Sequence, residues 1–87
     1  MNNKHKELYK KTKTIKELLE KNLIGTKGKR QAQAETEQLI KNQGLKYSKG
    51  TNPSYTHYYL SINGFPGSIS LFVEYNTSSI VTGITIY

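Results

Sequence analysis

His57 and Glu74 are the two residues of this chain that could together perform acid–base chemistry. Both lie in segments where apolar and polar residues alternate, and a hairpin between the segments would place the two side chains on one face of a sheet. A carboxylate beside an imidazole fixes its tautomer and raises its basicity, which suits proton transfer. Pairs of this kind also occur as structural contacts, so the pair defines a candidate site and leaves its role open.

The carboxyl end, Ile84-Thr85-Ile86-Tyr87, resembles the Thr-x-Tyr ending of EndoU-type and related toxin ribonucleases. Sheets of those enzymes carry His, Ser or Thr, and Tyr, so the resemblance implies metal-independent RNA cleavage by a site made of His57, Glu74, Thr85 and Tyr87. The register predicted below places Thr85 ~16 Å from His57, at ~3.4 Å per residue and ~4.8 Å between strands. One phosphate cannot contact both at that distance, and we expect no catalytic residue.

The segment from Gly25 to Arg30 is the best local binding site in the sequence. Lys27, Lys29 and Arg30 stand at the start of an expected helix, where the first turn leaves backbone amides unpaired and the dipole adds partial positive charge. A phosphate can be held in such a place. The glycine spacing of a P-loop and its Ser or Thr are missing, and the alternative is a solvated basic turn.

Charge is strongly segregated along the chain. Thirteen Lys and Arg with five acids give residues 1–49 a charge of +8, whereas residues 50–87 contain only Glu74 and carry −1. Lysines occupy so many positions of the first expected helix that one face, including Lys10 and Lys13, becomes a cationic stripe. A polyanionic partner, most often nucleic acid, fits this pattern, and phosphate contacts of this kind carry no sequence information.

Four aromatic residues, Tyr55, Tyr59, Phe72 and Tyr87, are expected on the sheet face away from the aliphatic core. An exposed aromatic row can stack single-stranded bases, or it can bind another protein chain or a second copy of this one. Because the strands from residue 55 onward carry no Lys or Arg, we expect a protein interface. The alternative is that residues 45–54 cover part of the row.

Composition restricts the remaining classes of protein. Cysteine is absent, which excludes disulfides, thiol nucleophiles and thiolate metal sites. The basic amino terminus is followed by no apolar run that could serve as a signal peptide or a membrane span, so we expect a cytoplasmic protein with no membrane contact. We expect no cofactor and no metal. Leu, Ile, Val and Phe make up 20 of 87 residues, enough for one small folded domain.

Apolar spacing predicts the elements. Leu8, Ile15, Leu18, Leu19 and Leu23 form one stripe of a helix over residues 4–24 that ends at Gly25, and a second, weaker helix covers residues 29–42 before Gly44. Residues 45–47 open a short strand before a loop over residues 48–54. Alternation with period two then predicts three strands near residues 57–62, 68–75 and 80–87. The fold class is α+β: two N-terminal helices on one face of a three- to four-stranded antiparallel meander, in a single domain over residues 1–87.

Short turns set the expected register. If Asn63 pairs with Ser68 and Asn76 with Ser79, the core face aligns Leu60, Leu71 and Ile84. On the opposite face, His57 then faces Glu74, and Tyr59 faces Phe72.

Three functions follow from these features. The first is a non-catalytic nucleic-acid-binding module that contacts phosphates through Lys10, Lys13, Lys27, Lys29 and Arg30. The second is a protein-binding inhibitor or accessory factor, of phage or mobile-element type, that docks on a nucleoprotein complex or forms a homodimer through Tyr55, Tyr59, Phe72 and Tyr87. The third is the ribonuclease described above. Charge favours the first.

Overall fold

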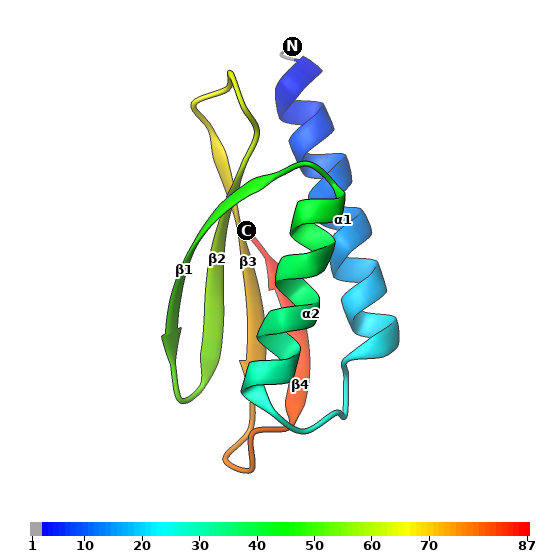
Figure 1. Ribbon diagram of the computed structural model, residues 1–87, viewed down its shortest axis with the longest axis vertical. Helices are drawn as coiled ribbons and strands as arrows, with labels where there is room; N and C mark the ends of the chain where they lie inside the picture. The colour runs from blue at the N-terminus through cyan, green and yellow to red at the C-terminus, as the bar shows by residue number, and fades with distance from the viewer. Residues whose placement is uncertain (1–2) are drawn as a thin grey trace.

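The computed structural model describes residues 3–87 and has two helices followed by four strands (Figure 1). The elements are α1 (Asn3–Asn22), α2 (Lys29–Asn42), β1 (Lys46–Asn52), β2 (Tyr55–Ser61), β3 (Ser68–Tyr75) and β4 (Val81–Ile86). The strands form one antiparallel sheet in the order β1-β2-β3-β4. The predicted α+β class is confirmed, with the helices before the meander.

Both helices pack on the same face of the sheet, and within residues 3–87 no helix or strand lies over the other face (Figure 1). From α1 the core receives Leu8, Ile15 and Leu19, from the turn that follows it Leu23, and from α2 Ala32 and Ile40. Alternate residues of the strands meet them, including Tyr58, Leu60, Leu71 and Val73, each at most 1% exposed. A sheet with one covered face needs apolar side chains only at alternate positions, which explains the period of two.

Two positive-φ glycines mark the ends of the helices. After α1 the chain turns through Gly25 at φ 87°, and after α2 it turns through Gly44 at φ 72°. This left-handed conformation costs glycine little because glycine has no Cβ. Both stops lie where the sequence predicted them, and the predicted bounds of α2 are those of the structure.

The predicted loop over residues 48–54 is wrong, because residues 48–52 belong to strand β1. It runs from Lys46 to Asn52 and pairs with β2 along its whole length, from Lys46 opposite Ser61 to Asn52 opposite Tyr55. Only Pro53 and Ser54 connect the two strands, and the Asn52 side chain accepts hydrogen bonds from the amides of Ser54 and Tyr55. A strand at the sheet edge has one neighbour and little to pack, so it tolerates glycine at position 50.

The predicted register between β2 and β3 is wrong by two residues. Ser61 pairs with Ser68, which makes His57 the partner of Phe72 and Tyr55 the partner of Glu74. The connection is longer than a tight turn because Ile62 and Phe65 pack against the core, and the amide of Phe65 bonds back to the carbonyl of Ile62. His57 therefore does not face Glu74 directly.

The pairing of β3 with β4 also differs from the prediction. Phe72 pairs with Thr85 and Glu74 with Gly83, and the register shifts between Glu74 and Tyr75. Because a shift of one residue exchanges the two faces of a strand, Val81 enters the core at 1% exposure while Thr82 points to solvent. Ser79, with φ 61°, shapes the turn before this irregularity.

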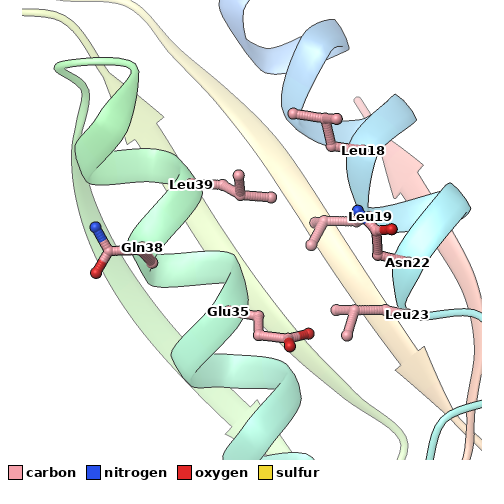
Figure 2. Close-up of a pocket in the computed structure, with 7 residues that line it drawn as sticks. All are labelled: Leu18, Leu19, Asn22, Leu23, Glu35, Gln38 and Leu39. Atoms are coloured by element: carbon pink, nitrogen blue, oxygen red, sulfur yellow. The ribbon is translucent and has the colours of Figure 1, made fainter.

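A shallow groove runs between α1 and α2 (Figure 2). Leu18, Leu19 and Leu23 line it from α1, and Leu39 points toward them from α2. Across this groove the weak apolar stripe of α2 packs against the stronger stripe of α1, and this packing holds α2 in place.

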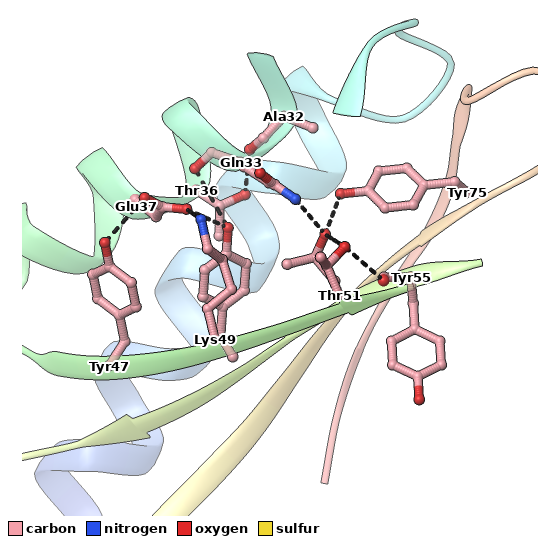
Figure 3. Close-up of polar contacts among 11 residues, drawn as sticks. Ala32, Gln33, Thr36, Glu37, Tyr47, Lys49, Thr51, Tyr55 and Tyr75 are labelled. Atoms are coloured by element: carbon pink, nitrogen blue, oxygen red, sulfur yellow. Dashed lines mark hydrogen bonds and ion pairs between the residues drawn. The ribbon is translucent and has the colours of Figure 1, made fainter. Parts of the chain in front are cut away.

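A polar network fastens α2 to the sheet at Glu37 (Figure 3). The carboxylate accepts hydrogen bonds from the Tyr47 hydroxyl at 3.0 Å, the Tyr58 hydroxyl at 2.9 Å and the Lys49 ammonium at 2.8 Å. Burial alone would raise the pKa of Glu37, but the three donors outweigh it and hold the pKa below its usual value.

Glu37→Gln should destabilise the fold by about 1–2 kcal/mol at neutral pH, because a neutral amide cannot accept all three hydrogen bonds. The pKa of Glu37 is lowered in the folded state, so its contribution is present above the unfolded pKa of about 4.3 and is lost as pH falls through the folded pKa. Urea unfolding at neutral and acid pH measures this, and the difference between wild type and variant should shrink in acid. Glu35→Gln, at an exposed position of the same helix, serves as the control and should change little.

Candidate nucleic-acid interface

The solvent face of α1 carries a row of four lysines. Lys6, Lys10, Lys13 and Lys21 are all exposed and project away from the buried stripe of the helix. At ~1.5 Å per residue, the row from Lys6 to Lys21 extends over ~22 Å. None of the four ammonium groups bonds another described residue, whereas Lys11 and Lys16 pair with Glu7 and Glu20.

The expected sites Lys10 and Lys13 thus lie in one row with two residues that the prediction did not single out. Lys6 and Lys21 were detectable from the sequence, because they stand four and eight positions from Lys10 and Lys13, respectively, on the same helical face. Glu17, also exposed, falls between Lys13 and Lys21 and weakens the positive field there.

The loop at the start of α2 is tied to the sheet by backbone hydrogen bonds. Gly25 donates to the Val81 carbonyl, Val81 donates to Thr26, and Gly28 donates to Ser79. Gly28, at φ 116°, takes the position of the N-cap, and no side chain among the described residues caps the helix. The first-turn amides of α2 thus have no side-chain cap, and Lys27 and Arg30, both exposed, stand beside them; a phosphate can bind at such a helix start.

Lys29 has a different environment from the other two cations of the loop. Its ammonium lies 5.3 Å from the centre of the Tyr75 ring, a distance at which the ring attracts a cation. The same two residues, with Pro53, Ser54 and Asn76, border a hollow at the end of the sheet. Lys29 is thus directed to the end of the sheet, over a ring of the covered face.

The bare sheet face is built from rows of residues set by the observed pairing. Ser48, Tyr59, Ser70 and Tyr87 form one row, and Gly50, His57, Phe72 and Thr85 form the next. Asn52, Tyr55, Glu74 and Gly83 form the third. The four predicted aromatic residues all lie on this face, as expected. Lys46, beside Ser61, is a cation of this face that the prediction missed.

His57 lies within a stack of rings. The centre of its imidazole is 3.9 Å from that of Tyr59 and 4.1 Å from that of Phe72, with only 18° between the His57 and Phe72 planes. Its Nε2 atom is buried and has no hydrogen-bond partner among the described residues. Burial lowers the pKa of His57, because the stack disfavours the charged imidazolium.

The other residues implied by the ribonuclease resemblance lie closer to one another than predicted. Thr85 stands in the row of His57, two strands away, which corresponds to ~10 Å and replaces the ~16 Å of the predicted register. The Thr85 hydroxyl donates a 2.9 Å hydrogen bond to Glu74. Tyr87 is 80% exposed and sets its ring nearly perpendicular to that of Phe72, at 5.5 Å. The structure thus brings Glu74 to Thr85 rather than to His57.

Comparisons with known proteins returned nothing: no family model, curated protein or solved structure matches the chain. Within residues 3–87, no three His, Asp or Glu side chains gather in a group that could hold a metal ion. No helix in the same range is long and apolar enough to cross a membrane.

The position of His57 generates a test by titration. Its NMR titration midpoint should lie below the usual value of about 6.5, because burial in the ring stack opposes charging. A lowered folded pKa means that the unfolded chain binds more protons, so His57 supports folding at neutral pH and the support is lost as pH falls. His57→Phe, which keeps a stacking ring, should flatten the decrease in unfolding free energy between about pH 7 and pH 5. A midpoint above the usual value would instead indicate a carboxylate partner.

Proposed function

We propose that this protein is a nucleic-acid-binding module that contacts the phosphate backbone. The observation that carries the proposal is the row Lys6, Lys10, Lys13 and Lys21, whose ammonium groups bond no described residue. Side chains in such a row can each neutralise a phosphate and release its counterion.

The loop at residues 25–30 adds a second point of attachment. Lys27 and Arg30 supply mobile charge, and the uncapped first turn of α2 supplies fixed amide donors. The cations of α1 and of this loop would contact phosphates, and such contacts carry no sequence information.

The double variant Lys10→Gln/Lys13→Gln should weaken binding to a labelled RNA or DNA and flatten its dependence on salt. Loss of two phosphate contacts reduces the slope of log K against log salt by ~1.4 for single strands, at ~0.7 per contact. Fluorescence anisotropy over a series of salt concentrations measures the slope. Lys27→Gln/Arg30→Gln should act in the same direction.

A matched control separates contacts from overall charge. Lys11→Gln/Lys16→Gln removes the same two charges from the same helix, but those ammonium groups are engaged with Glu7 and Glu20, so its slope should stay near that of the wild type. Glu17→Gln should strengthen binding by removing the acid within the row. Equal loss in both double variants would contradict a contact through the row.

RNA cleavage is a second candidate function, favoured by one specific observation. The hydrogen bond from Thr85 to Glu74 holds a carboxylate on the bare face, with His57 in the row of Thr85. Such a carboxylate can accept the proton of an attacking 2′-hydroxyl. The buried, unpartnered Nε2 of His57 counts against a proton donor at the other side of the phosphate.

Incubation of labelled RNA with excess protein in EDTA tests the second candidate. Cleavage by this face should give fragments that persist without metal and disappear in Glu74→Gln, while the salt-dependent binding through α1 remains. Intact RNA after prolonged incubation would remove the cleavage reading and leave the binding module. Thr85→Val, which keeps the shape but not the hydroxyl, should reduce cleavage less than Glu74→Gln.

A further inference from the structure

The bare sheet face contains an open hollow beside the end of the ring stack. Tyr55, Ser70, Phe72, Glu74, Thr85 and Tyr87 line it, with a volume of about 460 Å³, within the ~300–1,000 Å³ typical of small-ligand sites. His57 covers the β2 side of the Phe72 ring. The opposite side of the ring faces Thr85 on β4 and borders the hollow.

The walls of the hollow fit a flat ring. Tyr55 and Tyr87 stand nearly perpendicular to Phe72, with ring centres 5.3 Å and 5.5 Å away and interplanar angles of 75° and 85°, and all three rings line the hollow. A planar ligand on the side of Phe72 opposite His57 would continue the order Tyr59, His57, Phe72 as a fourth ring. Nucleobases bind proteins in this way, by stacking on aromatic side chains.

Glu74 determines which base the hollow suits. Its carboxylate is exposed, takes one hydrogen bond from Thr85 and lies over Gly83, where a Cβ would come within 3.0 Å of Oε1. An ionised carboxylate only accepts hydrogen bonds. Among the four RNA bases, guanine alone presents two neighbouring N–H donors, N1–H and the N2 amino group, that match the two carboxylate oxygens.

A second hollow, which Lys29 borders, lies at the end of the sheet, one residue along β2 and β3 from the first. Ser54 and Tyr75 line the hollow that Lys29 borders. They are adjacent in sequence to Tyr55 and Glu74, which line the hollow beside Phe72. A strand of nucleic acid can therefore pass from Lys27, Lys29 and Arg30 around the end of the sheet onto the bare face.

We infer that the hollow on the bare sheet face binds a guanine base of a single-stranded nucleic acid, stacked on Phe72 and hydrogen-bonded to Glu74. The inference deepens the proposed function and rests on it for the polyanionic ligand. It adds base preference to a module whose lysines contact only phosphates.

The test compares five-nucleotide RNAs that differ at the central base, UUGUU, UUAUU, UUCUU and UUUUU, by fluorescence anisotropy. The guanine oligonucleotide should bind about 5-fold to 150-fold more tightly than the others, as expected for a bidentate base contact. Glu74→Gln should abolish this preference without weakening binding of UUUUU, because it removes a negative charge. Phe72→Ala should weaken binding of all four by a similar factor, with circular dichroism to confirm folding.

Gly83→Ala provides a variant that keeps every charge. The added methyl displaces the carboxylate and should reduce the preference for guanine while leaving UUUUU unaffected. Guanosine and inosine, which carry no phosphate, test the hollow separately. Guanosine should shift the amide resonances of Phe72, Glu74 and Thr85, and inosine, which lacks the N2 amino group, should shift them less at equal concentration.

The outcomes distinguish this inference from the proposed function. Equal affinity for all four oligonucleotides, with normal salt dependence, would overturn the inference and leave the proposed function. If no oligonucleotide binds, the proposed function fails, and the guanosine resonances then decide the inference: shifts at the hollow support it, and their absence overturns it. A dimer in sedimentation that Phe72→Ala dissociates would also overturn it, because the face would be a protein interface.

Discussion

The structure depends on a single constraint: two helices cover only one face of a four-stranded sheet. Burial of Tyr58, Leu60, Leu71 and Val73 against the leucines of α1 uses the alternate positions of each strand, and the positions between them must then face solvent. Natural sheets of this kind place polar side chains there. On that face this chain places aromatic rings beside short hydroxyl side chains.

Charge segregation follows from the same architecture. A helix that packs with one stripe has most of its circumference in water, and α1 uses it for lysines, with Glu7 and Glu20 balancing only Lys11 and Lys16. The covered face of the strands carries one cation among residues 3–87, Lys49 of β1, which stays exposed and pairs with Glu37. The polar exception is Glu37, which receives donors from two tyrosines and Lys49 and so joins α2 to β1 and β2 at little cost in unsatisfied groups.

The faces of the strands were predictable from the sequence, whereas the rows across them were not. The β2–β3 register differs from the prediction by two residues, an even number that leaves His57, Tyr59, Phe72 and Glu74 on the expected face but changes their neighbours. Nothing in the residues around Asn63-Gly64 indicated that Ile62 and Phe65 would pack and lengthen the loop. Between Glu74 and Tyr75 the pairing with β4 shifts by one residue. The predicted assignment of side chains to the two faces is therefore wrong at Val81. The neighbours of His57 therefore depend on the length of the β2–β3 loop, which the local sequence pattern does not determine.

The proposed phosphate contacts and the proposed base contact lie on opposite sides of this molecule. The lysine row of α1 and the hollow beside Phe72 are separated by the helical layer and the sheet, in a body 42 × 23 × 19 Å across. A duplex presents bases only within grooves between its phosphates, so it cannot engage a flat sheet face and the distant helix face together. A flexible single strand can, because its bases turn away from the backbone and its path can bend around the end of the sheet at Lys29 and Tyr75. The arrangement of charge and aromatic rings thus supports a single strand as the proposed ligand, even though charge alone would favour the duplex, with its denser phosphates.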